Sequence, residues 1–193
     1  MQRRDLISLA TAWLMLSPSE TMAAPRHPFA KLIDLDTVRH YRPDPQKFTL
    51  AVFMTAQQNY ASCGEAFIGV RELISMLGAQ DKIDPILVMP RSADQPDPSD
   101  LRNLAKAQQY KMRVLTGALP DVLAAAYAVG ASFQIDSQRK VVGHEDPPRA
   151  YFLTSRGETL AHHPANDYLG FLKDARRLMN ACQKPENTSV CFG

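Results

Sequence analysis

Cys63 is the residue of this chain whose type and position best suit chemistry. It follows an apolar run, Phe48–Met54, and begins a segment whose apolar residues recur at helical spacing. The first N–H groups of a helix have no partner within the helix and carry partial positive charge, which stabilises a thiolate at that position. The sequence therefore favours a reactive thiol. The alternative is a buried structural cysteine, because cysteine is among the most buried residue types.

Two further cysteines, Cys182 and Cys191, flank a short polar stretch near the end of the chain. Three cysteines allow one disulfide and leave one thiol, and three pairings are possible. A local Cys182–Cys191 bridge would pin this end of the chain and leave Cys63 free, and this is the pairing that we predict. In the alternative, one of these two cysteines resolves an oxidised Cys63, because a lone thiol cannot complete a dithiol–disulfide cycle.

Histidine and methionine supply the other candidate ligands. His144 lies in a polar stretch, where it is either an exposed loop residue or a metal ligand through a neutral ring nitrogen. Met54 and Met89 end two apolar runs, and their thioethers suit soft metal ions, although methionine also fills gaps in cores. His162 and His163 are adjacent, so on a strand they point to opposite faces, and we expect a strand end at the surface.

The elements that position these residues alternate along the chain. Apolar runs predict strands over Phe48–Met54, Ile83–Met89, Met112–Leu115, Ala150–Thr154 and Glu158–His162. Helices are predicted after Cys63 as far as Gly78, from Ser99, from Pro120 to Val129, and from Asn166 or Asp167. The polar stretch from Gln134 to Pro148 should form a hairpin or a loop.

This order of elements predicts a three-layer α/β domain. A β-α-β unit followed by a β-hairpin and a helix is the thioredoxin-like arrangement, in which the strand and helix from Met112 to Val129 are an insertion. The loop that carries Cys63 would then leave the carboxyl end of the first core strand. Ligands bind at that end of the strands in open α/β sheets.

Composition bounds the class of protein. The chain has 193 residues, of which 45% are hydrophobic and 22% charged, and its net charge is +2. This is enough chain for one ordinary globular domain. The nearly balanced charge gives no reason to expect nucleic acid or an anionic membrane as a partner.

The first residues indicate export. A basic start with Arg3 and Arg4 precedes an apolar run from Leu6 to Leu16, and small residues follow up to Ala23. This is typical of a secretory signal peptide, of the general or the twin-arginine type, and the run is too short to span a bilayer. We expect cleavage near Ala23 and a periplasmic or secreted chain, where disulfides persist. The alternative, an uncleaved segment, would associate the protein with a membrane.

The sequence thus divides into four parts. Residues 1–23 are the expected signal peptide, and residues 24–47, rich in proline and charge, are expected to form an irregular lead-in that packs on the domain. Residues 48–181 are the expected thioredoxin-like domain. Residues 182–193 are the expected C-terminal tail.

Several motifs resemble the Sco/SenC family of thioredoxin-fold copper chaperones and redox proteins. That family has a D-P-x-x-D-T-P signature, an L-T-G with a downstream A-x-A-Y-x-V, and a last strand that runs into D-x-x-G. The similar segments here are Val88–Pro96, Leu115–Gly117 with Ala124–Val129, and Tyr151–Gly157. The resemblance spans about Phe48 to Leu172, the length of one domain. It implies copper or thiol handling with a protein partner during maturation of a cuproprotein, by resemblance cytochrome c oxidase.

The residues at the family's active site depart from its pattern. Counted without gaps from the first strand, Cys63 takes the place of the second cysteine of C-P-x-x-C-P, and Asn59 that of the first. Counted back from Gly157, Asp146 falls where the family has its histidine, and His144 lies two residues earlier. The family binds copper through two thiolates and one imidazole, a set suited to Cu(I). The resemblance therefore implies a degenerate, weak copper site with Cys63 and His144 as ligands.

A second alignment of the same loop gives a different comparison. Cys63-Gly-Glu-Ala66 is similar to the C-G-P-C of thioredoxin-like thiol oxidoreductases with its second cysteine lost, and Pro148 falls where those proteins have a cis-proline. Both alignments leave one thiol, Cys63, as the catalytic or redox residue. Whether the chain is an enzyme stays open. The hypotheses are a Sco-like accessory protein, a non-catalytic thioredoxin-fold binding module, and a single-thiol oxidoreductase.

Overall fold

The computed structural model describes residues 27–54, 69–72, 74–78, 81–91, 97–107, 112–135, 141–144, 149–164 and 167–192. The predicted signal peptide and the loop that contains Cys63 lie outside these residues. The strands are β1 (Ile33–Asp34), β2 (Arg39–His40), β3 (Phe48–Phe53), β4 (Ile83–Arg91), β5 (Arg113–Ala118), β6 (Phe133–Ile135), β7 (Val141–His144), β8 (Arg149–Leu153) and β9 (Thr159–Pro164). The helices with both ends described are α2 (Pro98–Ala107), α3 (Leu119–Val129), α4 (Tyr168–Cys182) and α5 (Pro185–Phe192).

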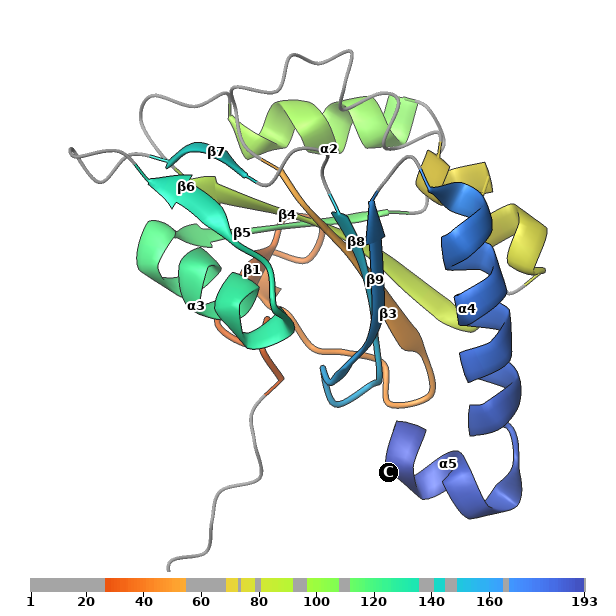
Figure 1. Ribbon diagram of the computed structural model, residues 1–193. Helices are drawn as coiled ribbons and strands as arrows, with labels where there is room; N and C mark the ends of the chain where they lie inside the picture. The colour runs from red at the N-terminus through yellow and green to blue at the C-terminus, as the bar shows by residue number, and fades with distance from the viewer. Residues whose placement is uncertain are drawn as a thin grey trace, which may run out of the picture.

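Seven strands form one mixed sheet in the order β2-β1-β5-β4-β3-β8-β9 (Figure 1). β3, β4 and β5 are parallel, whereas β8 runs antiparallel to β3 and β9 antiparallel to β8. The strands β4-β3-β8-β9 are the predicted thioredoxin-like core. β5 and α3 extend that core beyond β4, as predicted for the insertion. For the stretch from Gln134 to Pro148 the prediction was a hairpin or a loop, and its described residues favour the hairpin, because β6 pairs antiparallel with β7.

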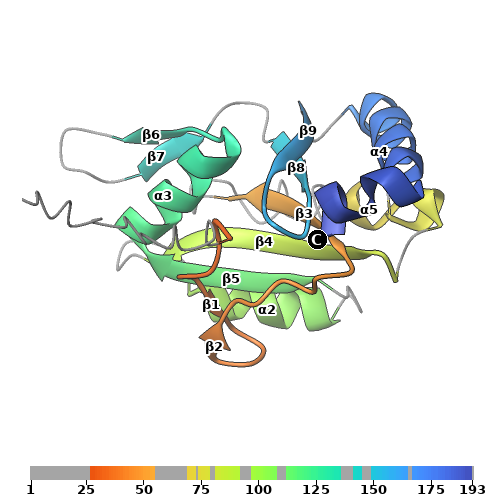
Figure 2. The same cartoon turned by 90° about the horizontal axis from the view of Figure 1, so that it is seen from below.

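Both faces of the sheet are buried, because side chains on β3 alternate between two cores. Phe48, Leu50, Val52 and Met54 belong to a first core, and Ala51 with Phe53 to a second. The first core also holds side chains from α4 and from the helix that contains residues 69–72 and 74–77. The second core packs against α3. Figure 2 shows α2 and α3 on opposite sides of β4 and β5, so the molecule has three layers.

The predicted ends of several elements are confirmed. Gly78 follows the first helix with a φ of 62°, a left-handed conformation that suits glycine. Asp167, rather than Asn166, caps α4, since its carboxylate accepts a hydrogen bond from the backbone N–H of Gly170 at 3.0 Å. Pro120 stands in the first turn of α3, where its missing N–H has no cost.

The lead-in is not wholly irregular, which corrects the prediction. β1 pairs antiparallel with both β2 and β5, so residues 27–47 extend the sheet at the edge beyond β5. Phe29, Leu32 and Tyr41 are each at most 2% exposed and belong to the second core. The lead-in is therefore part of the domain.

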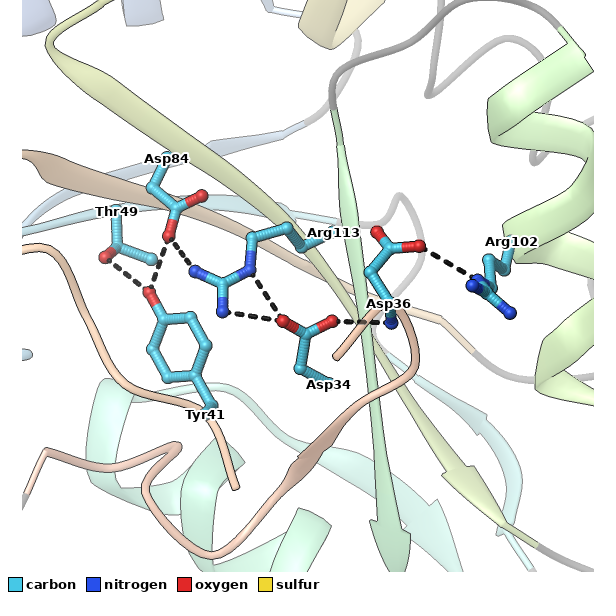
Figure 3. A network of polar contacts seen from close by, with 7 residues as sticks. All are labelled: Asp34, Asp36, Tyr41, Thr49, Asp84, Arg102 and Arg113. Atoms are coloured by element: carbon cyan, nitrogen blue, oxygen red, sulfur yellow. Dashed lines mark hydrogen bonds and ion pairs between the residues drawn. The ribbon is translucent and has the colours of Figure 1, made fainter. Parts of the chain in front are cut away.

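A buried polar network fixes the lead-in to the sheet (Figure 3). Arg113 donates to the fully buried carboxylate of Asp34 through two nitrogens, at 3.0 and 2.7 Å, and to Asp84 at 2.9 Å. The Tyr41 hydroxyl donates to Asp84 at 3.0 Å and lies 3.4 Å from the Thr49 hydroxyl. Burial raises the pKa of both Asp84 and Tyr41. Since Thr49, Asp84 and Arg113 lie at the amino ends of their strands, the network is far from the edge expected for ligands.

Two further ion pairs continue this network to α2. Asp36, in the turn after β1, contacts Arg102 at 2.9 Å and Lys106 at 3.1 Å. Burial opposes ionisation of Asp36, but the hydrogen bonds from the two cations hold its pKa below the usual value. The turn after β1 is thereby held against α2.

The C-terminal segment is helical rather than a plain tail. α4 runs to Cys182 and α5 follows, and the predicted Cys182–Cys191 disulfide is confirmed, with its Cα atoms 5.7 Å apart. The ring of Phe192 packs edge-on against that of Phe48, with centroids 4.7 Å apart. The backbone N–H and the hydroxyl of Ser155 both donate to the carbonyl of Cys191. α5 is thus part of the domain, beside the amino end of β3.

Candidate functional site

The carboxyl edge of the sheet is where the sequence predicts the loop that carries Cys63. β3 ends at Phe53, and the backbone N–H of Met54 donates to the carbonyl of Val88 at 2.9 Å, so the two strands still run side by side there. The chain continues from Met54 into the segment that carries Asn59 and Cys63, which lies outside the described residues. Asp146 and Pro148 are outside them as well.

The hairpin of β6 and β7 brings the backbone of His144 to this edge. His144 is the last residue of β7 and pairs with Phe133 of β6. The ring of Phe133 packs against that of Phe53 with centroids 5.8 Å apart. The hairpin therefore lies against the end of β3, from which the Cys63 loop departs. The side chain of His144 is outside the described part of the chain.

His162 extends a row of rings on the same face of the sheet. Its ring lies 5.8 Å from that of Tyr151, which lies 5.7 Å from that of Phe53. The Nδ1 atom of the exposed His162 is 3.0 Å from a guanidinium nitrogen of Arg149 and accepts its hydrogen bond. This confirms the predicted surface position at a strand end.

His163 points to the opposite face, as its adjacency to His162 predicts. Its Nε2 lies 3.1 Å from a carboxylate oxygen of Asp174, and its Nδ1 lies 3.4 Å from one of Asp167. The ring also contacts that of Phe171. Since both ring nitrogens face α4, His163 ties β9 to that helix. No sequence signal indicated this role, because the partners come together only when α4 packs on the sheet.

Met54 and Met89 are both 2% exposed and lie in the first core. The sequence left them as either thioether ligands or core residues. They lie at the carboxyl ends of β3 and β4, on the face that the helix with Val70 covers. Their position is therefore compatible with packing and with soft-metal binding.

Within the described ranges, no group of three or more histidine, cysteine, aspartate or glutamate side chains is placed to hold a metal ion. The disulfide occupies two of the three cysteines, so Cys63 has no cysteine partner within the chain. In the same part of the chain, none of the helices is both long and apolar enough to cross a membrane.

Solved structures with a similar fold include two copper-bound Sco proteins. Yeast Sco1 with copper bound aligns with a TM-score of 0.60 at 13% identity over 82% of this chain and 90% of its own. Arabidopsis thaliana ScoI with copper bound gives 0.54 at 15% identity over 76% and 95%. An uncharacterized thioredoxin-like protein from Porphyromonas gingivalis gives 0.55 at 13% identity over 81% and 93%. No protein-family model and no curated protein matches the sequence.

These identities are low, so the likeness bears on the fold. The chain has the thioredoxin-like fold that the Sco proteins share. The fold implied by the sequence motifs is confirmed, including the inserted strand and helix.

Proposed function

We propose that this chain is an exported Sco-like accessory protein that handles copper or thiols for a protein partner through Cys63. By the sequence resemblance, the partner is a cuproprotein, such as cytochrome c oxidase, or a thiol protein. The observation that carries the proposal is the Cys182–Cys191 disulfide. It takes two of the three cysteines and leaves Cys63 as the one thiol, in a fold shared with copper-bound Sco structures.

The position of the disulfide also bears on the chemistry of Cys63. The disulfide is buried, and Cys191 lies beside the amino end of β3, whereas the Cys63 loop follows the carboxyl end. A tail cysteine is therefore poorly placed to resolve an oxidised Cys63. A lone thiol can still bind a soft metal ion as thiolate, or form a mixed disulfide that a partner's thiol resolves. We favour metal binding or a single-thiol role over a complete redox cycle.

A second candidate is a non-catalytic thioredoxin-fold binding module. The identities of Asn59 and Asp146 favour it, because amide and carboxylate oxygens are hard donors that suit Cu(I) poorly. A single-thiol oxidoreductase is the third. The three hypotheses are distinguished by whether Cys63 specifically binds Cu(I), specifically reacts with a thiol reagent, or does neither.

Anaerobic titration of the mature domain with Cu(I), in competition with a chromophoric chelator, tests the proposal. We expect binding much weaker than that of a site with two thiolates and a histidine. Cys63→Ser should abolish most of it, and Asn59→Cys should raise the affinity more than about tenfold, or about 1.4 kcal/mol. Cys63→Ser with unchanged affinity would contradict the proposal. An unchanged affinity in Asn59→Cys would instead favour the alignment with C-G-P-C.

Export is part of the proposal, and it has its own test. We expect cleavage near Ala23 or Ala24, because small residues follow the basic and apolar segments there. N-terminal sequencing of the protein recovered from the periplasm or the medium should begin at or next to Ala24. A mature chain that retains Met1 would show that the segment is an anchor or is not a signal.

A further inference from the structure

The helix α3 has apolar side chains on both of its faces. The inner face is buried in the second core and consists of Val122, Ala125, Ala126 and Val129. The opposite face carries exposed or partly exposed residues at helical spacing, which we call the outer stripe: Pro120, Leu123, Ala124, Tyr127 and Ala128. A surface helix normally has a polar outer face, and a helix that is apolar all round is normally buried. The outer stripe is therefore unusual for a surface.

The charge of α3 limits what can cover the outer stripe. The five residues of the stripe are uncharged, and the ring of Tyr127 leaves that residue 66% exposed. Asp121 is the charged residue of α3, and it lies beside the stripe with Lys31 at 3.7 Å. Contiguous exposed apolar surface marks interaction sites. Because the stripe itself carries no charge, it offers nothing that would select an acidic or a basic partner.

We infer that the outer stripe is the contact surface between two copies of this chain, with α3 antiparallel to α3 of the second copy. In a twofold interface the same surface meets itself, so a charged stripe would repel its own copy and an uncharged one does not. Ala124 is the middle residue of the 11 in α3. Its small side chain at the twofold axis lets the two helices approach closely. Tyr127 of each copy then packs over the first turn of the other helix.

The charges at the two ends of α3 favour the antiparallel arrangement. The amino end has Lys31, whose side chain is 74% exposed, beside Asp121. At the other end the carbonyl of Val129 accepts a hydrogen bond from the hydroxyl of Thr159, and the exposed Glu158 is the preceding residue. Antiparallel pairing brings Lys31 of one copy toward the acidic end of the other. It also places opposite ends of the two helix dipoles together, whereas parallel pairing would place like ends together.

This dimer leaves the carboxyl edges of the two sheets free. α3 begins directly after β5, at the carboxyl edge, and ends beside Thr159. Thr159 pairs with Leu153, which pairs with Thr49 near the amino end of β3. α3 therefore runs from the carboxyl edge toward the opposite edge, so an antiparallel pair puts the two carboxyl edges at opposite ends of the dimer. The inference goes beyond the proposed function and does not depend on Cu(I) or on Cys63.

Sedimentation velocity of the purified protein over a concentration series tests the dimer. One helix per copy gives a contact below the about 1,200 Å² of standard interfaces, so we expect a reversible dimer that forms at micromolar concentrations or above. Tyr127→Lys should weaken association by at least about tenfold, because it replaces the large ring of the stripe with a cation. Leu169→Lys is the matched control and should leave association unchanged. Leu169 is 79% exposed on α4, which lies far from α3 in both views (Figures 1 and 2).

Cross-linking tests the antiparallel arrangement. In a Cys63→Ser background, Ala124→Cys supplies one free thiol at the proposed axis, and a short bifunctional thiol reagent should link the two copies. Ala128→Cys is the control. It lies four residues from the axis, which separates its two copies by about 12 Å along the helices. It should therefore be linked far less than Ala124→Cys.

Each outcome supports the inference or overturns it. A protein that remains monomeric throughout the concentration series would overturn it. A dimer that Tyr127→Lys leaves intact, or that Leu169→Lys weakens equally, would show that α3 is not the contact. Cross-linking through Ala128→Cys that equals that through Ala124→Cys would overturn the antiparallel arrangement. Unfolding midpoints measured for every variant exclude loss of the fold as the cause of a lost dimer.

Discussion

His27 is a buried histidine whose protonation should weaken the fold. Its Nδ1 accepts a hydrogen bond from the backbone N–H of Phe29, its Nε2 has no hydrogen-bond partner among the described residues, and its ring lies against those of Phe29 and Tyr41. Burial lowers the pKa of His27 from 6.5 to about 4. The unfolded chain therefore binds more protons than the folded chain between these pH values, and the stability present above pH 6.5 falls as the pH drops toward 4.

We expect this residue to remove roughly 3 kcal/mol of unfolding free energy between pH 7 and pH 4. Urea denaturation at several pH values measures the slope. His27→Phe should flatten this part of the profile, while the exposed His40, changed to Asn, should leave it unchanged. If the two variants show the same pH dependence as the unmodified chain, another group accounts for it.

Single residues also show what the sequence could and could not indicate. The pairing of Cys182 with Cys191 was predictable, because the two are close in the chain and flank a turn-forming stretch. The ion pair of Asp34 and Arg113 joins residues 79 positions apart, and nothing local in the sequence announces it. Val38 has a positive φ of 55°, which β-branched residues rarely adopt. This conformation arises from the β1–β2 turn and not from any preference of valine.

Among the elements, α5 depends on the disulfide for its position against the domain. The disulfide from Cys182 to Cys191 closes a short loop and holds Phe192 against Phe48. Replacing both cysteines with serine should lower the unfolding free energy by about 2–3 kcal/mol, because the unfolded chain gains freedom and two polar groups enter a buried position. Chemical denaturation of the double variant measures the loss. Cys63→Ser is the control and should leave the midpoint unchanged, and equal midpoints for all three proteins would contradict the prediction.

The elements that the sequence predicted are those with a strong period or a turn signal. β3 and β4 are apolar runs in the sequence, and the turn around Gly157 indicated the hairpin that joins β8 to β9. β1 and β2 were missed, since each has two residues and neither has an apolar pattern. β1 is a strand because β5 offers an edge to pair with, and β2 pairs in turn with β1. α5 was missed because its packing, and not its sequence, stabilises it.

For the whole molecule, the sequence predicted a domain that begins at Phe48, the first residue of β3. The hydrophobic core also includes residues that precede β3. The lead-in supplies Phe29, Leu32 and Tyr41 to the second core. It also supplies Asp34, without which Arg113 would keep only Asp84 as an acidic partner in the buried network. The sequence did not reveal this, because proline and charge in residues 24–47 resemble a linker when their distant partners are unknown.

A chain that begins at Phe48 should therefore fail to fold cooperatively, whereas one that begins at Ala24 should fold. Burial of a large apolar side chain contributes about 1.5–3 kcal/mol, so the loss of three removes about 5–9 kcal/mol. That loss is comparable to the whole stability of a typical domain, about 5–15 kcal/mol. Thermal unfolding followed by circular dichroism compares the two chains under oxidising conditions that preserve the Cys182–Cys191 disulfide. A cooperative transition at the same midpoint in both would contradict the prediction. It would show that the lead-in packs on a domain that is already complete, and that the ion pairs of Asp34 and Asp36 add little to the stability of that domain.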